Sequence, residues 1–239
     1  MHITFIQDFI DILRGKKNKK LKEINEMLEN NNISIPNDIK EKITLNIVGK
    51  NNTVVIPENN RIVGNVCINI YGDSNKIIFD DNFDLSGLCS ILIGQNHPNF
   101  GKVKNSTFNV GKNTSIESLN YITFNSNTFC NIEDYCMLSY GVTIYNTDAH
   151  PIFKKGTNEV INKVKGITIG KHSWIGMNVT ILKNSIIPSN SIVGCNAVYS
   201  MGGGKNQSYC AFAGNPARVV KENVDWNSNG AKFGYIDNE

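Results

Sequence analysis

Histidine is scarce in this chain of 239 residues, so few side chains could act as an acid or a base near neutral pH. The four histidines are His2, His97, His150 and His172. His150 stands in the string Asp148-Ala-His-Pro, immediately before a proline that stiffens the chain, and the surrounding polar stretch is long enough for a functional loop. Such a histidine suits a general base, and a loop histidine without a role is an equal alternative from these residues alone.

Trp174 is the second residue whose type and position suggest a site. It is one of two tryptophans, it follows His150 by 24 residues (174 − 150), and it stands within Lys171-His-Ser-Trp-Ile-Gly. The plain alternative is a bulky structural residue. The six cysteines form no CxxC pair and have no histidine at zinc-finger spacing, which argues against a zinc ribbon or a redox motif and predicts free, mostly buried thiols.

A six-residue repeat indicates the elements that would position these residues. Aliphatic residues recur at every sixth position from Ile169 through Ile175, Ile181 and Ile187 to Val193. This period fits neither a helix nor an ordinary strand. It predicts a parallel β-helix in which the aliphatic side chains point inward and glycine and asparagine take the corners, where positive φ angles occur. A second column of small or β-branched residues lies two positions before the aliphatic ones: Ser173, Val179, Ser185 and Ser191.

The pattern divides the chain into three parts. Residues 1–40 predict a helical and basic N-terminal segment, and residues 41–198 predict a β-helix of about eight or nine coils. A polar insert at residues 145–167 interrupts the repeat, and residues 199–239 predict a C-terminal loop and tail.

Composition excludes several classes of protein. The net charge is only +3, from 24 basic and 21 acidic residues, which argues against a nucleic-acid partner. No apolar run reaches the ~18 residues of a transmembrane helix, and the N-terminus does not have the order of a secretory signal. We therefore expect a protein of the cytoplasm without a transmembrane segment.

Taken together, the hexads, the DAHP insert, KHSWIGMNVTIL and AFAGNPARVV resemble the hexapeptide-repeat acyltransferases, over roughly residues 45 to 221. Within them the chain is most similar to the acetyl-CoA-dependent O-acetyltransferases of bacterial surface polysaccharides, including sialic-acid capsules. The resemblance implies an all-β solenoid: a left-handed parallel β-helix with a short N-terminal helical segment and an extruded active-site loop. It also implies a homotrimer whose active sites lie between neighbouring helices, with acetyl-CoA as co-substrate and no metal.

The resemblance also implies roles for individual residues. His150 would be the general base, with Asp148 or a backbone carbonyl orienting its ring, and Trp174 would line the acetyl-CoA site near the thioester. The remaining donor-binding positions would be Met177 and Cys195 for the pantetheine arm, Ser200 and Met201 after the last coil, and Arg218 and Lys221 near the nucleotide phosphates.

The expected reaction is transfer of an acetyl group from acetyl-CoA to a sugar hydroxyl of a surface polysaccharide, by direct attack and without an acyl-enzyme. An N-acetyltransferase acting on an amino-sugar nucleotide is the nearest alternative. A non-catalytic β-helix that serves as a scaffold is a third.

Overall fold

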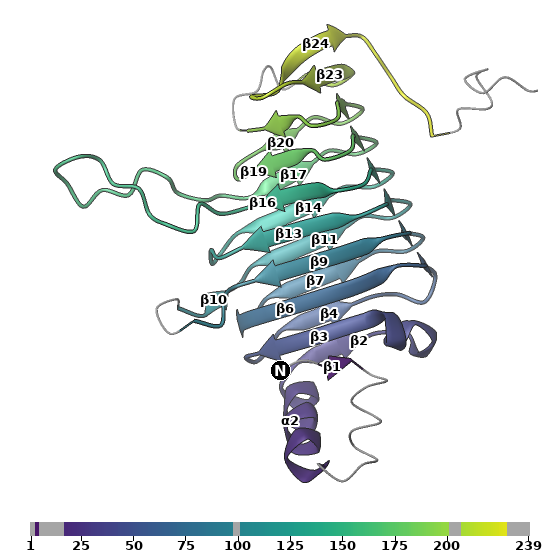
Figure 1. The fold of residues 1–239 in the computed structure, drawn as a ribbon, viewed down its shortest axis with the longest axis vertical. Coiled ribbons are helices and arrows are strands. Elements are labelled where there is room, and N and C mark those ends of the chain that lie inside the picture. Colours follow the sequence, from purple (N-terminus) through teal and green to yellow (C-terminus); the bar gives the residue numbers. More distant parts are fainter. Residues whose placement is uncertain (1–2, 5–16, 98–100, 201–206, 229–239) are drawn as a thin grey trace, which may run out of the picture.

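The coils of this chain stack into a left-handed parallel β-helix with three faces (Figure 1). The structure is a computed structural model and describes residues 3–4, 17–97, 101–200 and 207–228. The first face contains β1 (Ile3–Thr4), β3 (Ile43–Val48), β6 (Asn65–Asp73), β9 (Leu88–Ile93), β13 (Leu119–Thr123), β16 (Val142–Tyr145), β19 (Thr180–Leu182) and β22 (Val198–Tyr199), with β10 (Val103–Lys104) beside β6.

The other two faces are built in the same way. The second face contains β2 (Asn32–Ser34), β4 (Thr53–Val55), β7 (Lys76–Phe79), β11 (Thr107–Val110), β14 (Phe129–Ile132), β17 (Ile167–Ile169) and β20 (Ile186–Ile187). The third contains β5 (Arg61–Ile62), β8 (Asp84–Leu85), β12 (Ser115–Ile116), β15 (Met137–Leu138), β18 (Trp174–Ile175), β21 (Ile192–Val193), β23 (Cys210–Ala213) and β24 (Arg218–Glu222). In the described part of the chain, seven parallel strands of the first face each open a coil, fewer than the eight or nine expected.

Columns of aliphatic side chains fill the interior, as the repeat predicts. Ile169 is in register with Ile132 in the coil before it and Ile187 in the coil after it, and all three are buried. The small-residue column that begins at Ser173 is also buried. Because no single coil can cover its own inward face, these columns hold successive coils together. The predicted core of the repeat is confirmed.

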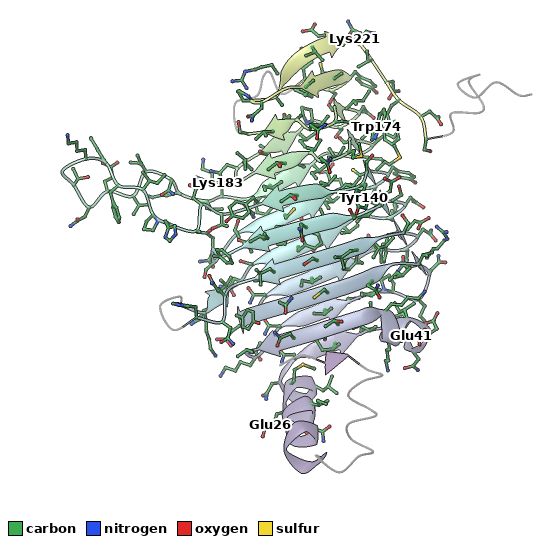
Figure 2. The ribbon with its side chains drawn as sticks, viewed as in Figure 1. Glu26, Glu41, Tyr140, Trp174, Lys183 and Lys221 are labelled. Carbon is green, nitrogen blue, oxygen red and sulfur yellow. The ribbon has the colours of Figure 1, made fainter. Side chains whose placement is uncertain are left out.

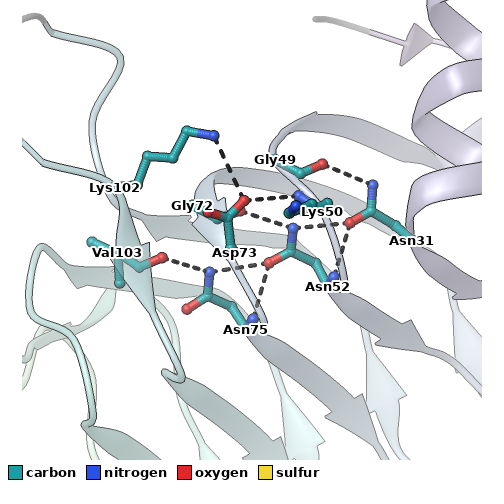
Figure 3. A network of polar contacts seen from close by, with 9 residues as sticks. All are labelled: Asn31, Gly49, Lys50, Asn52, Gly72, Asp73, Asn75, Lys102 and Val103. Atoms are coloured by element: carbon teal, nitrogen blue, oxygen red, sulfur yellow. Dashed lines mark hydrogen bonds and ion pairs between the residues drawn. The ribbon is translucent and has the colours of Figure 1, made fainter.

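A buried ladder of asparagines stiffens the corner that leads onto the second face (Figure 3). The Oδ1 atom of Asn31 accepts hydrogen bonds from both the backbone N–H and the side-chain amide of Asn52, each at 2.9 Å. Asn52 accepts the same pair from Asn75 at 3.0 Å, and Asn75 then accepts from the backbone of Ser106. The ladder therefore satisfies backbone donors that would otherwise be buried without partners.

Asparagine and glycine occupy the corners for different reasons. Asn178, Asn184, Asn190 and Asn196 have φ angles between 56° and 63°, which confirms that asparagine supplies the left-handed backbone. Gly94 and Gly141 also have positive φ, at 80° and 74°, but the glycines that follow the aliphatic residues of the hexads, Gly170, Gly176 and Gly194, do not. At Gly176 an added Cβ would lie 2.8 Å from the backbone nitrogen of Cys195, so close approach of the next coil is what requires glycine there.

Both flanks contribute strands to the stack. In the N-terminal part, α2 (Lys17–Asn30) and the 3-10 helix η1 (Asn37–Lys42) lie on either side of β2, which already pairs in parallel with β4 ahead of the expected boundary at residue 41. Beyond residue 198, β23 and β24 extend the third face. The two ends differ from the middle because β1 and β24 pair in antiparallel fashion with β3 and β23.

The cysteines answer one of the sequence-based predictions. All six cysteines are free, and four of them are buried, as predicted. Burial raises the pKa of Cys89 and of Cys136 to about 12, so neither thiol is a nucleophile near neutral pH.

In the part of the chain that the structure describes, no helix has both the length and the apolar character needed to cross a membrane.

Candidate active site

An arm formed by residues 146–166 projects from the stack between β16 and β17 (Figure 1). Its outer half is a short hairpin, closed by an antiparallel bridge between Phe153 and Val160. The arm begins and ends within one residue of the insert expected from the broken repeat. We call the corner from which it leaves, between the first and second faces, the arm edge.

Polar contacts fix the base of the arm. Lys183, on the next coil, places its Nζ 2.9 Å from Oδ2 of Asp148, and the side-chain amide of Asn162 donates to the same oxygen at 2.7 Å. The Asn162 amide also donates to the carbonyl oxygen of His150 at 2.9 Å. Ala149 between them has a φ of 60°, which turns the chain sharply at this point. These contacts hold the backbone of His150 at the root of the arm.

His150 faces a cavity of about 390 Å³ beneath the arm. Among the described residues its imidazole has no hydrogen-bond partner, and the side chain of Asp148 bonds to Asn162 and Lys183 instead. Asp148 therefore positions the arm, and its orienting contact with the imidazole stays a prediction. The cavity is lined by the arm and one earlier turn: Asn125, Asp148, Ala149, His150, Pro151, Val160, Asn162, Lys163 and Val164.

Trp174 opens β18 on the outside of the third face. The next residue, Ile175, is buried in the core, so the alternation of the strand turns the indole outward. Its Nε1–H donates to Oγ of Ser139 in the preceding coil at 3.3 Å. In successive strands Trp174 is in register with Ile192, then with Ala211, and then with Lys221 on β24. Trp174 and Lys221 thus share one column, three strand spacings or about 14 Å apart.

The other expected donor-binding residues are spread around the stack. Met177 and Cys195 are exposed on successive coils at the far end of the third face, where the backbone N–H of Asn196 donates to the carbonyl of Met177 at 2.8 Å. Arg218, also exposed, is in register with Ala213 at the top of the same face. Ser200 follows β22 and is partly buried, and Met201 lies outside the described residues.

The two principal residues lie on different sides of one chain. His150 is at the arm edge, between the first and second faces, whereas Trp174 begins the third face. Figure 2 shows Lys183, which binds the base of the arm, and Trp174 on opposite sides of the stack. A single chain therefore does not bring His150 and Trp174 together.

Sequence reasoning missed Trp226, which it placed in a polar tail. After β24 the chain returns along the corner between the second and third faces, which we call the tail edge. There the Trp226 indole stacks on the imidazole of His172, with ring centroids 4.6 Å apart and an interplanar angle of 12°. Its Nε1–H donates to the carbonyl of His172 at 2.9 Å. One signal in the sequence could have indicated this role: a tryptophan is rare in a tail that is otherwise polar.

The described residues place two separate groups of functional side chains on the stack. Within the described ranges, no group of three or more His, Cys, Asp or Glu side chains is placed to hold a metal ion. The site offers an imidazole beside a cavity on one edge. On another face it offers an outward indole below two exposed cations.

Comparison with known proteins identifies the family. No protein-family model matches the chain. A polysialic acid O-acetyltransferase of Neisseria meningitidis is 34% identical over 198 residues, 82% of this chain and 86% of that protein. One of Escherichia coli O1:K1 / APEC is 33% identical over 91 residues, 38% of this chain and 29% of that protein.

A solved structure supports the same fold. The crystal structure of the polySia specific acetyltransferase NeuO aligns with a TM-score of 0.62 at 23% identity, covering 83% of this chain and 93% of that one. The chain belongs to the polysialic acid O-acetyltransferase family and is an acyltransferase of the hexapeptide-repeat, left-handed β-helix class.

Proposed function

We propose that this protein transfers an acetyl group from acetyl-CoA to a hydroxyl of a sialic-acid-containing surface polysaccharide, in the cytoplasm, with His150 as general base. The single observation that carries the proposal is the placement of His150 beside a cavity at the root of an arm, in a chain related over most of its length to polysialic acid O-acetyltransferases. The charge of the arm supports an anionic acceptor, because residues 146–166 contain four lysines against two acidic residues.

The chemistry needs only one proton acceptor. As the sugar hydroxyl oxygen attacks the thioester carbonyl carbon, the neutral His150 imidazole takes the hydroxyl proton. The tetrahedral intermediate then collapses, the carbon–sulfur bond breaks, and the imidazolium returns the proton to the departing CoA thiolate. The free second nitrogen of the imidazole and the neighbouring cavity are compatible with this role. A backbone N–H near the thioester would stabilise the oxyanion.

The third face has the features that a CoA-type donor needs. Trp174 offers an apolar surface for the thioester end, and Lys221, in the same column, offers a cation for the phosphates. Met177 and Cys195 lie at the far end of the same face, where they would border the pantetheine arm, and Arg218 adds a second charge at the upper end. We include these residues in the donor site, with Ser200 and Met201 at its margin.

We further propose a homotrimer in which the arm of one copy reaches the third face of its neighbour. Two observations support it. His150 lies between β16 of the first face and β17 of the second, whereas Trp174 begins β18 of the third, so a second copy would be needed to complete the proposed site. The arm also exposes three large apolar side chains, Ile152, Phe153 and Ile161, at 52%, 50% and 58% of their surface. An isolated projecting arm gains no stability from such residues, and a neighbouring copy would bury them.

The reaction is tested with acetyl-CoA and a panel of polysialic acid, a neutral glycan and an amino-sugar nucleotide. Thiol release and product mass are followed for the wild type. An acetyl ester on polysialic acid that dilute base removes is the expected product. A base-stable amide on the amino sugar would replace the proposal with N-acetylation, and the absence of both CoA binding and transfer would favour a scaffold.

The shared site is tested by mixing two inactive variants. His150→Ala and Trp174→Ala are each expected to be inactive as pure trimers. After dissociation and joint reassembly in equal amounts, about a quarter of the pairs of neighbours would combine an intact His150 with an intact Trp174. Recovery of activity toward that fraction is expected, and no recovery from trimers shown by mass to be mixed would exclude a site between copies.

A further inference from the structure

Both tryptophans of the chain meet at the tail edge, although they lie far apart in the sequence. The ring centroids of Trp174 and Trp226 are 6.1 Å apart, and the rings are tilted by 43°. This spacing and tilt are within the range in which aromatic pairs attract each other. Trp174 is thus bounded on one side by Ser139, to which its Nε1–H donates, and on another by the Trp226 ring.

The segment that brings Trp226 to this position is anchored at several points. Asn223 turns the chain with a φ of 57°, and the backbone N–H of Val224 donates to the carbonyl of Tyr209 at 2.9 Å. Oδ1 of Asp225 lies 3.7 Å from Nδ1 of His172, and Trp226 both stacks on that imidazole and donates to its carbonyl. These contacts, which we call the latch, hold residues 223–226 against the coil that carries Trp174.

Residues of the coil also contribute to the latch. His172 has a left-handed φ of 54°, and its Nδ1 lies 3.2 Å from Oδ1 of Asn190 in the next coil. The ring against which Trp226 stacks is thus also held by a contact within the stack. Such preorganised contacts lower the cost of ordering a side chain when a ligand binds.

We infer that Trp226 is a positioning residue for the acetyl donor: it holds the Trp174 indole in the orientation that receives the thioester end of acetyl-CoA. The inference rests on the proposed function, because it takes Trp174 as part of the donor site. A tryptophan on the outer surface of a strand is otherwise free to change its χ angles, and each such change would remove the surface on which the donor rests. Trp226 would act through Trp174 and not on the acceptor.

The test compares Trp226→Ala, Trp226→Phe and a control, Val220→Ala, which shortens an exposed apolar side chain on β24 away from the pair. With polysialic acid saturating, Trp226→Ala is expected to raise the KM for acetyl-CoA about tenfold, equivalent to ~1.4 kcal/mol, and to change kcat less than twofold. Trp226→Phe keeps a stacking ring and is expected to recover most of that loss. The KM for the acceptor is expected to stay unchanged.

Two further measurements keep the inference separate from the proposed function. In both Trp226 variants Trp174 is the remaining tryptophan, and its near-UV circular dichroism reports without any substrate whether its indole is held in one orientation. A strong signal is expected in Trp226→Phe and a weak one in Trp226→Ala. Calorimetric binding of CoA to each variant is expected to follow the KM. An active wild type whose KM and CoA affinity survive Trp226→Ala would overturn the inference alone. A wild type that binds CoA and transfers nothing would overturn the proposed function while the affinities still decide the role of Trp226. A wild type that binds no CoA would overturn both.

Discussion

The arm and the coils of this protein are held in place by different forces. In the coils, columns such as Ile132, Ile169 and Ile187 are fully removed from water, and each strand pairs with one above and one below. The arm has one bridge between its own strands and a polar clamp at its base, formed by Asp148, Asn162 and Lys183. Its large apolar side chains point outward.

The coils and the arm would therefore meet two different requirements of group transfer. The donor must be bound in one geometry, and the third face is a part of the rigid stack. The proposed acceptor is a polymer that must enter and leave, and the proposed base, His150, lies on the projecting arm. Low local stability is typical of loops that close on ligands. The four predictions below test this separation, from the largest expected effect to the smallest.

Removing the base should affect activity and leave the coils intact. His150→Ala is expected to lower kcat by about 10²–10⁴-fold, the usual contribution of a general base, with no change in the melting temperature. His97→Ala removes a histidine from another exposed loop and is the matched control, expected to retain wild-type turnover. Equal losses of turnover in the two variants, measured by thiol release, would show that His150 has no special role.

Removing core volume should do the reverse. Ile187→Ala is expected to lower the free energy of unfolding by about 2–5 kcal/mol, because Ile187 is fully buried. Its neighbour on β20, Ile186, is 54% exposed, and Ile186→Ala is expected to cost much less. Urea denaturation followed by circular dichroism measures both, and similar losses would show that the columns do not carry the stability of the stack.

Close approach of successive coils predicts unequal effects at two glycines. Gly176→Ala places a Cβ 2.8 Å from backbone atoms of the next coil and is expected to cost about 1–3 kcal/mol. At Gly194 the nearest atom would be 3.4 Å away, an ordinary contact, so Gly194→Ala is expected to be nearly neutral. Thermal unfolding of the two variants distinguishes this explanation from one in which both glycines supply only backbone flexibility.

The smallest effect is expected at the clamp of the arm. Asp148→Asn removes the charge that faces Lys183, and since the pair is partly exposed it contributes ~1 kcal/mol or less, so kcat/KM should fall about fivefold at most. Faster proteolysis within the arm should accompany the loss. Glu159→Gln breaks only an exposed contact of 3.9 Å with Lys154 and is expected to change neither quantity. A hundredfold loss in Asp148→Asn would indicate direct participation in proton transfer.

The repeating part of the fold was predictable because its signal is strictly periodic. Hexads from Ile169 to Val193 identified the inward columns, and the break in the period located the arm. The asparagine ladder was not predictable, since Asn31, Asn52 and Asn75 are separated by 21 and then 23 residues (52 − 31 and 75 − 52). That spacing depends on the length of each early coil, and these lengths follow no fixed period.

The site was predictable in its residues and not in its geometry. Residue types and spacing singled out His150 and Trp174, but which face each occupies depends on the number of corners between them. Trp226 was missed because its role depends on the chain reversing after β24, and the polar residues around it give no sign of that reversal. The predicted positive φ is confirmed at Gly94 and Gly141, whereas at Gly176 the close approach of the next coil is what requires glycine.

The antiparallel strands at the two ends of the stack have a consequence for how the molecule behaves in solution. A parallel coil leaves its last strand ready to accept another of the same kind, so an uncapped stack is a template for growth along its axis. At the third face, β24 runs against β23, and at the first face β1 runs against β3, so these edges no longer present the direction that a further coil requires. These two edges are therefore closed to the addition of a further parallel coil.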